Sequence, residues 1–252
     1  FRKNVEKKTY IPQPKVIDGW EVSQGHIMCG KSFVVSLRRS GWTLSHFCGG
    51  SIIDERHVLT AAHCVYGLTA SDIKVVVGDV LLDRSHCTSA RRHVKEIYIR
   101  EGYDNNTFVN DIAILLLSRP FPVDNTNIKM IRLALETPVQ GTTCTVSGWG
   151  ITDEDSQVLP NHLQAANMSL ITNCKNHKFS IYAGTIQEGM ICAGDNNGID
   201  SCKGDSGGPL QCEGLLVGIV SWGDGCGKPY FPGVYTEVSH HYDWIHSLTS
   251  LE

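Results

Sequence analysis

The sequence lacks the features of a membrane protein and of a nucleic-acid-binding protein. It contains no run of about 18 apolar residues, the length that a membrane-spanning helix needs. Basic residues are not in excess, because 22 Lys and Arg stand against 26 Asp and Glu, a formal net charge of -4 at pH 7. Proteins that bind nucleic acid usually have a basic surface. We therefore expect neither a membrane nor nucleic acid as a partner.

Other absences narrow the class further. No CxxC pair occurs, so a cysteine-ligated zinc site is not expected. There is no internal repeat of fixed period and no low-complexity tract. Hydrophobic residues make up 41% and charged residues 19%, which is ordinary for a globular protein and unlike a disordered one. A chain of 252 residues predicts one compact unit with a sizeable core.

Cysteine, in contrast, is abundant. Ten cysteines are many for a protein of the reducing cytosol, and their even number suits full pairing in an oxidising compartment. Sequons at Asn105 and Asn167 agree with secretion, although such triplets also arise by chance. Residues 1–8 contain no apolar segment, so we interpret the sequence as a form from which a signal peptide has been removed. These features predict a secreted, extracellular glycoprotein.

The basic groups Arg38-Arg39 and Arg91-Arg92-His93 allow two interpretations. Each is either a solvated loop, which is the commoner case, or part of a binding surface for an anionic partner.

The order of sequence patterns predicts an all-β protein. Residues 1–15 are polar and include Pro12 and Pro14, which is typical of a flexible arm. Beyond them, short β-rich runs separated by turn residues indicate a barrel or sandwich. One helix is expected from about Val238 to Leu248, with Ser239 as a candidate N-cap. The clearest strand runs are 33–37, 51–53, 73–77, 112–116, 143–146 and 215–220.

The most informative stretch is Asp-Ser-Cys-Lys-Gly-Asp-Ser-Gly-Gly-Pro at 200–209. A serine hydroxyl is a poor nucleophile, so a catalytic serine needs a sharply turned backbone and nearby N–H donors for an oxyanion. The glycines on both sides of Ser206 supply such a turn. A Gly-rich turn alone is more often an ordinary loop. A catalytic role for Ser206 therefore also requires a candidate base and a candidate carboxylate elsewhere in the chain.

A base has to be chosen among eleven histidines. His63 lies in Leu-Thr-Ala-Ala-His-Cys, where small residues leave space around the ring and a cysteine can hold the backbone. His57 has charged neighbours in Asp-Glu-Arg-His, which suggest an exposed turn. We therefore predict that His63 is the base.

The base needs a carboxylate that fixes its tautomer and stabilises its cation. Asp111 is the candidate, because it stands at the start of the apolar run 112–117, where an unpaired charge would be costly. Standing alone, Asp111 would more often be a turn residue at the start of a strand.

Together these residues resemble the chymotrypsin-like serine protease family, from about Val16 to the C-terminal helix. The resemblance implies two packed six-stranded antiparallel β-barrels with a C-terminal helix, and catalytic residues His63, Asp111 and Ser206 in the cleft between the barrels. It implies an oxyanion hole made by the N–H groups of Gly204 and Ser206. The order His, Asp, Ser is the family's, and three motifs match: Ala-Ala-His-Cys at 61–64, Asp-Ile-Ala-Ile-Leu at 111–115 and Gly-Asp-Ser-Gly-Gly-Pro at 204–209.

The resemblance also implies a substrate preference. Asp200, six residues before Ser206, matches the base of the family's specificity pocket. A carboxylate there implies cleavage after Arg or Lys, and which of the two is preferred stays open. Without the resemblance, Asp200 could be a turn residue. The implied pocket walls are Ser221, Trp222, Gly223 and Gly233.

Two residues depart from common trypsins. Lys203 lies at the pocket rim where a neutral residue is usual, and Phe108 would place a ring near Asp111. We hypothesise that Lys203 favours acidic substrate residues near the cut bond. The alternative is a solvated lysine of little effect.

Residues 15–19, Lys-Val-Ile-Asp-Gly, resemble the family's activation junction. The resemblance implies that cleavage after Lys15, by another protease or by the enzyme itself, frees the Val16 ammonium to pair with Asp205 and order the site. We therefore predict an inactive precursor, with residues 1–15 as the activation propeptide and 16–252 as the trypsin-like protease domain.

The family's disulfide pattern implies four bridges here and leaves Cys29 and Cys87, which we expect to pair. The loop at 78–90 binds calcium in some relatives, but its only acidic residues are Asp79 and Asp83, too few for a carboxylate-rich site. We predict no metal and no other cofactor. The implied bridges are Cys48 with Cys64, Cys144 with Cys212, Cys174 with Cys192, and Cys202 with Cys226.

The expected partners are protein and peptide substrates, proteinaceous inhibitors and an activating protease, and the expected state is a monomer. One alternative is a non-catalytic member of the same fold that acts as a binding or regulatory protein. It is disfavoured because the three catalytic residues are all present. The other is an esterase with its nucleophile in an α/β sheet, which the strand-rich pattern opposes.

Overall fold

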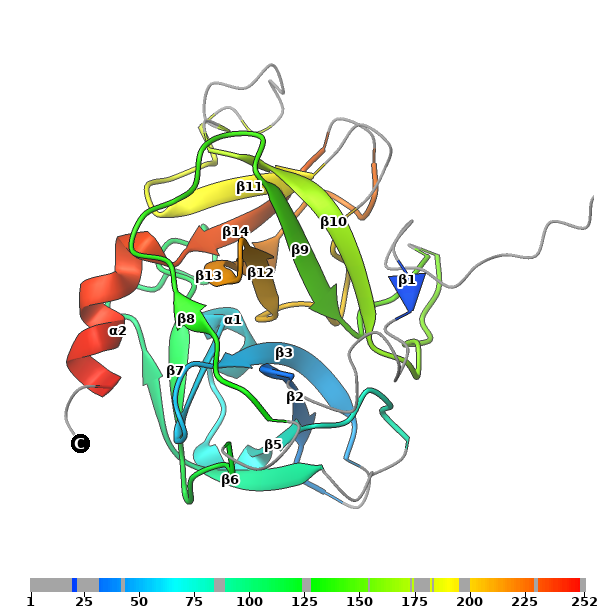
Figure 1. The fold of residues 1–252 in the computed structure, drawn as a ribbon, viewed down its shortest axis with the longest axis vertical. Helices are drawn as coiled ribbons and strands as arrows, with labels where there is room; N and C mark the ends of the chain where they lie inside the picture. The colour runs from blue at the N-terminus through cyan, green and yellow to red at the C-terminus, as the bar shows by residue number, and fades with distance from the viewer. Residues whose placement is uncertain are drawn as a thin grey trace, which may run out of the picture.

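A computed structural model describes most of the chain from residue 20 onward. Two β-barrels lie one above the other, with the C-terminal helix along one side of both (Figure 1). The described residues are 20–21, 32–41, 44–83, 89–123, 128–153, 155–172, 174, 182, 184–194, 200–228 and 231–249.

The first barrel closes in the strand order β2-β3-β4-β7-β6-β5, with all neighbours antiparallel. Its interior is filled by fully buried aliphatic side chains such as Leu37, Leu59 and Ile114. Alternate residues of a strand face opposite sides, so a closed barrel buries one set completely. The strands are β2 (Val34–Arg39), β3 (His46–Ile52), β4 (His57–Thr60), β5 (Ile73–Val77), β6 (Ala90–Ile99) and β7 (Ala113–Leu117).

The second barrel follows the order β10-β11-β14-β13-β12-β9, and the β10–β9 pairing closes it. Two short strands extend this sheet: β1 (Trp20–Glu21) pairs with β10, and β8 (Arg132–Leu133) runs parallel to β13. The prediction of two six-stranded antiparallel barrels is confirmed. The strands are β9 (Thr143–Gly148), β10 (Gln164–Ile171), β11 (Met190–Gly194), β12 (Pro209–Cys212), β13 (Leu215–Trp222) and β14 (Gly233–Glu237).

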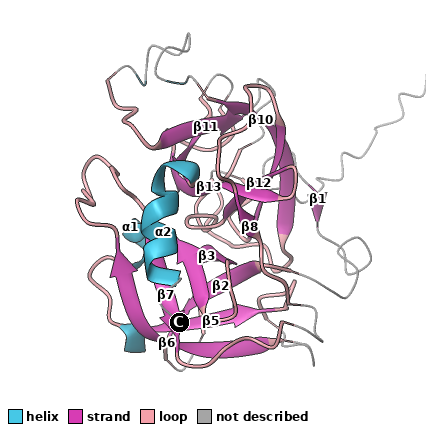
Figure 2. Ribbon diagram, turned by 60° about the vertical axis from the view of Figure 1, so that its left-hand side comes forward, coloured by secondary structure: helices cyan, strands magenta, loops and turns pink. Residues whose placement is uncertain are grey.

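Within the described residues, the helical elements are short (Figure 2). The predicted terminal helix is present as the 3-10 turn η4 (Ser239–His241) followed by α2 (Tyr242–Thr249), which buries Ile245. Ser239 as its N-cap is wrong, because Ser239 lies inside the 3-10 turn and its Oγ donates to Glu237 Oε1 at 3.3 Å. The other helical segments are α1 (Ala62–Val65) and η1 (Ala70–Asp72).

His57 is not in an exposed turn, as its charged neighbours had suggested. It begins β4 and is only 4% exposed. The carboxylate of Asp54 accepts the His57 backbone N–H at 2.8 Å and contacts its Nδ1 at 2.7 Å. This local pairing satisfies the polar groups of the histidine and lets it be buried.

The two basic groups do not lie in loops either. Arg38-Arg39 ends β2, and Arg91-Arg92-His93 lies within β6. Arg38 is 4% exposed, and its guanidinium donates to Ser36 Oγ and to the Leu82 carbonyl, each at 3.1 Å. Arg38 is therefore a buried strand residue, whereas Arg39 is exposed.

The four disulfides implied by the resemblance are formed: Cys48–Cys64, Cys144–Cys212, Cys174–Cys192 and Cys202–Cys226. Cys29 and Cys87 lie outside the described residues. None of the helices in the described part of the chain has the length and apolar character needed to cross a membrane.

Candidate active site

The structure brings His63 and Asp111 together although 48 residues separate them. His63 lies in α1, directly after β4, and Asp111 lies two residues before β7, the neighbour of β4. Asp111 Oδ2 contacts His63 Nδ1 at 2.7 Å, and Asp111 Oδ1 accepts the His63 backbone N–H at 2.8 Å. The carboxylate therefore holds both the ring and the backbone of the histidine.

Asp111 is fully buried, and three donors compensate the cost of burying its charge. Besides the two groups of His63, Ser221 Oγ donates to Oδ2 at 2.5 Å. Thr236 Oγ1 donates to the Asp111 backbone carbonyl at 2.8 Å and fixes the main chain. Ser221 and Thr236 belong to the second barrel, so that barrel positions a carboxylate of the first.

Asp54 and His57 repeat this geometry elsewhere in the first barrel. Their ring contact is 2.7 Å and their backbone hydrogen bond is 2.8 Å, as in the His63 pair. The difference is access, because the His63 side chain is 19% exposed and the His57 side chain 5%. Only His63 can reach an outside molecule.

Glycines on both sides of Ser206 shape its turn as expected. Gly204 has φ 103° and Gly207 has φ 77°, both in the region that side chains disfavour. A Cβ at Gly207 would also lie 2.2 Å from Thr60 Oγ1, on the strand that leads to His63. The Ser206 carbonyl accepts the Gly49 N–H at 2.7 Å, which ties this turn to the first barrel.

The N–H groups of this turn divide into occupied and available donors. Those of Asp205, Gly207 and Gly208 donate to backbone carbonyls. Those of Gly204 and Ser206 have no acceptor in the part of the chain that the structure describes. Two neighbouring free donors beside a serine hydroxyl form a site that can receive a negatively charged oxygen.

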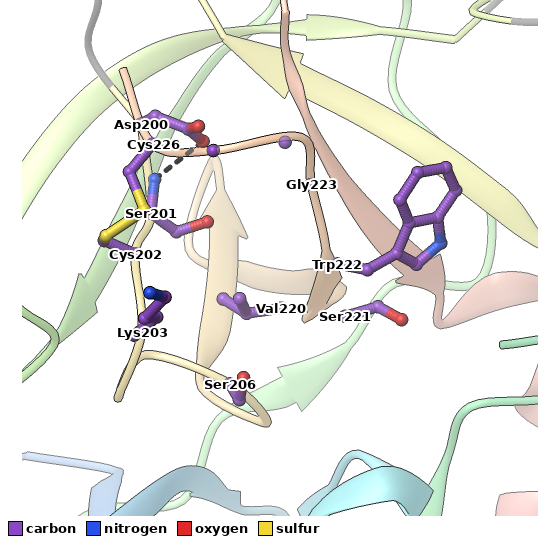
Figure 3. A pocket seen from close by; sticks show the side chains of 12 residues that line it. Asp200, Ser201, Cys202, Lys203, Ser206, Val220, Ser221, Trp222, Gly223 and Cys226 are labelled. Carbon is purple, nitrogen blue, oxygen red and sulfur yellow. Dashed lines mark hydrogen bonds between the residues drawn. A yellow bond between two sulfur atoms is a disulfide. The ribbon is translucent and has the colours of Figure 1, made fainter. Parts of the chain in front are cut away.

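Ser206 and Asp200 lie at opposite ends of one pocket, with Val220 between them (Figure 3). The pocket has a volume of about 220 Å³. Asp200 is 4% exposed and accepts N–H groups of Ser201 at 2.8 Å and Gly227 at 3.2 Å. Burial raises its pKa to about 7, and a cation beside it would favour its ionised form.

The predicted walls of this pocket are in place. Ser221, Trp222, Gly223 and Gly233 all line it. A Cβ at Gly233 would lie 2.7 Å from Asp200 Oδ1, so a side chain there would intrude on the carboxylate. A Cβ at Gly223 would meet nothing closer than 3.6 Å. Gly233 is therefore the glycine on which the open pocket depends.

Asp205 is buried and does not line the pocket. It is 1% exposed, and its two oxygens accept the N–H groups of Gly150 at 2.7 Å and Cys202 at 2.9 Å. Burial raises its pKa to about 6. A Cβ at Gly148 or Gly150 would come within 2.3 Å of its oxygens. Its expected partner Val16, with Lys15, lies outside the described residues.

The two residues that depart from common trypsins both border the site. Phe108 has φ 56°, and its ring meets the His63 ring edge-on with centroids 5.7 Å apart. Lys203 is exposed and lines the pocket of Asp200.

Two connections to the site were not predicted from the sequence. One is the hydrogen bond from Ser221 to Asp111. The other is His46, whose Nδ1 contacts Ser36 Oγ and whose Nε2 contacts the Gly204 carbonyl, each at 2.8 Å. Burial lowers the pKa of His46 to about 4, so a neutral ring joins the barrels behind the turn of Ser206. No local motif marks the bonds of Ser221 to Asp111 and of His46 to Gly204, because each joins residues more than 100 positions apart.

Among the described residues, one cluster has the composition of a metal site: Cys48, His63 and Cys64. Both sulfurs belong to the Cys48–Cys64 disulfide and so cannot bind a metal as thiolates.

Comparison with known proteins places this geometry in context. The family model described as Trypsin matches residues 21–245. The chain is 38% identical over 233 residues to Trypsin epsilon of Drosophila erecta, covering 92% of this chain and 86% of that protein. It is 38% identical over 250 residues to Trypsin zeta of Drosophila melanogaster, covering 94% and 87%. Among solved structures, mouse neuropsin, a serine protease of the limbic system, matches with a TM-score of 0.77 at 35% identity, over 86% of this chain and 94% of that one.

Proposed function

The chain belongs to the trypsin family of serine proteases, which act on protein substrates, and from this premise we propose that it is the precursor of a secreted endopeptidase that cuts after Arg or Lys. The observation that carries this proposal is the single pocket with a serine at one end and a buried carboxylate at the other.

In the proposed mechanism, Ser206 is the nucleophile and His63 its general base. Asp111 accepts a hydrogen bond from the N–H at Nδ1, so the proton of the neutral ring stays on Nδ1 and Nε2 is the basic nitrogen. The closest described partner of Nε2 is Cys64 Sγ at 3.7 Å, and this disulfide sulfur has no proton to donate, so the lone pair of Nε2 stays available. Nε2 takes the proton of Ser206 Oγ as this oxygen attacks the substrate carbonyl. The imidazolium then returns the proton to the leaving amine, and water releases the acyl group in the same way.

The N–H groups of Gly204 and Ser206 are proposed as the oxyanion hole. The negative charge on the substrate oxygen develops fully only in the tetrahedral transition state, so donors held in place stabilise that state above the bound substrate. The glycine at 204 keeps its N–H in this orientation because φ 103° is accessible to it.

Asp200 is the proposed determinant of the preference for Arg or Lys. A cationic side chain that enters the pocket meets a carboxylate removed from water, where an ion pair is stronger than at the surface. The walls Ser221, Trp222, Gly223 and Gly233 accommodate its aliphatic stem.

Activation is proposed to follow cleavage after Lys15, with residues 1–15 as the propeptide and 16–252 as the protease domain. The buried Asp205 carboxylate supports this, since it has two N–H donors and, within the described residues, no ion pair. The freed Val16 ammonium would supply the cation and favour the ordered state of the neighbouring turn. Another protease or the enzyme itself can make this cut.

Secretion is proposed from the disulfides and the sequons. Four formed bridges suit an oxidising compartment, and we propose that Cys29 and Cys87 form a fifth. Asn105 lies exposed in a turn, the usual setting for an attached sugar. Asn167 lies within β10 with its side chain bonded to Thr145 Oγ1 at 2.8 Å, which makes it the poorer of the two acceptors. We further propose a monomer that proteinaceous inhibitors can block.

The decisive experiment is labelling by an organophosphonate before and after cleavage at Lys15. We expect Ser206 to react much faster in the cleaved protein, and a peptide library to be cut after Arg or Lys. Failure to label would support the non-catalytic alternative. Equal labelling of the intact chain would contradict the activation step, and faster cutting after Phe or Leu would contradict the role of Asp200.

A further inference from the structure

A second hollow adjoins the pocket of Asp200, on the other side of Lys203. Its volume is about 390 Å³, against about 220 Å³ for the pocket. Phe47 of the first barrel and Ile151 and Leu159 of the second line it, together with Gly204. Lys203 lines both hollows and so stands between them.

This position decides which part of a substrate the hollow can receive. In the proposed function, the residue before the cut bond fills the pocket of Asp200, and its carbonyl oxygen meets the N–H groups of Gly204 and Ser206. Gly204 is also a wall of the second hollow. The residues that follow the cut bond are therefore the ones within reach of this hollow.

The pocket has the carboxylate of Asp200 besides Lys203, whereas no described carboxylate lines the second hollow. The Lys203 side chain is exposed and, among the described residues, has no ion pair or hydrogen bond, whereas its backbone carbonyl accepts the Ile151 N–H at 2.9 Å. Arg39 does not line the hollow itself, but its guanidinium lies 4.7 Å from the centroid of the ring of Phe47, which does, and it also interacts electrostatically with Asp72. The remaining titratable lining group, His46, is neutral at pH 7 because burial lowers its pKa to about 4.

Carboxylates are present nearby but do not line the hollow. Asp153 and Asp155 belong to the loop that contributes Ser156 and Gln157 to the lining, and both are exposed. Their field is that of solvated charges, which water and salt screen strongly. Lys203 lines the hollow and Arg39 lies over the ring of Phe47, one of its walls, so a bound side chain that displaces water would strengthen the effect of these cations.

We propose that this hollow binds an acidic substrate side chain on the leaving-group side, with Lys203 and Arg39 as the residues that set the preference. The inference rests on the proposed function and extends it: the substrate has a basic residue before the cut bond and an acidic residue within the next three. The apolar floor of Phe47, Ile151 and Leu159 suits the methylene stem of glutamate, and the cations suit its carboxylate.

The test uses the protein cleaved at Lys15 and quenched peptides with Arg before the cut bond. Glu, Gln or Lys is placed at the first, second or third position after the bond, or at the same distances before it. We expect kcat/KM to favour Glu over Lys at one position after the bond, by about fivefold or more for two exposed cations. Raising the salt concentration should reduce this ratio.

Lys203→Gln and Arg39→Gln should each lower the Glu-to-Lys ratio by about two- to fivefold, and the double variant should bring it close to one. Lys129→Gln is the matched control, because it removes an exposed lysine that lines neither hollow. The ratio is taken within each variant, so a change in folding or in the catalytic step cancels.

The outcomes separate this inference from the proposed function. Equal cutting of Glu and Lys peptides, a preference for Lys, a preference confined to positions before the bond, or a ratio unchanged in the double variant would overturn this inference alone. A protein that reacts with the phosphonate at Ser206 but cuts no Arg peptide would overturn the proposed specificity, and this inference with it.

Discussion

Replacing Asp111 by Asn should lower kcat by about 10⁴-fold, the largest effect we expect from the loss of one side-chain charge. Asparagine keeps the size of the side chain, but its NH₂ group can donate to His63 Nδ1. That favours the tautomer with the proton on Nε2, which cannot accept a proton from Ser206. The measurement is kcat of the cleaved enzyme on an Arg peptide, with the rate of phosphonate labelling as a second readout.

Asp54→Asn is a matched control for this substitution. Asp54 contacts His57 at the same distances as Asp111 contacts His63, so the chemical change and the broken bonds are alike. We expect a loss of stability, because the buried His57 loses its partner, and kcat within about threefold of wild type. Comparable losses of kcat in the two variants would mean that Asp111 acts through the fold rather than on the base.

Replacing Asp200 by Ser should lower kcat/KM for Arg and Lys peptides by about 10²- to 10⁴-fold, the cost of removing one partner of a buried ion pair. The kcat/KM for cutting after neutral residues should decrease much less. The preference for Arg and Lys over neutral residues should therefore be lost while cutting after neutral residues persists. A library profile of both proteins tests this. If Asp200→Ser still strongly preferred Arg, the selectivity would have to come from another group.

The raised pKa of Asp200 predicts a pH dependence of cation binding. Because burial raises this pKa to about 7, the Asp200 carboxylate is protonated and neutral in a growing fraction of molecules as the pH falls below 7. A bound cation favours the ionised form, so its affinity should decline through this range and level off above it.

The suitable measurement is the inhibition constant of a small aromatic amidinium between pH 5 and 9. Inhibitor binding is measured rather than kcat, so that the chemical step does not contribute to the pH dependence. A neutral inhibitor of the same shape should show no such decline, and Asp200→Ser should abolish it. A pH-independent constant for the amidinium would contradict the raised pKa.

How far the sequence predicts the fold depends on the pattern of each strand. The predicted run 73–77 coincides with β5, and 215–220 lies within β13, because apolar residues dominate there. β6 was not among the runs, since its sequence Ala-Arg-Arg-His-Val-Lys-Glu-Ile-Tyr-Ile alternates buried residues with long charged ones. Its place in the first barrel comes from hydrogen bonding to β5 and β7.

The histidines show the same limit at the site. Charged neighbours made His57 look exposed, yet a carboxylate three residues away satisfies it and lets it be buried. Small neighbours singled out His63, and its exposure of 19% agrees with a reactive role. The sequence could not reveal the contacts of Ser221 and His46, because both depend on how the two barrels pack.

The sequence by itself determined the features that are local in the chain: the glycine turn around Ser206, the strand runs and the identity of the candidate residues. Backbone conformation at Gly204 and Gly207 depends on the absence of a side chain, which can be read from the sequence alone. Only the tertiary structure decided that Asp54 holds His57, that Ser221 and His46 support the site from across the barrels, and that Lys203 stands between two hollows. Those properties arise from burial and from contacts between residues far apart in the chain, and no local pattern encodes them.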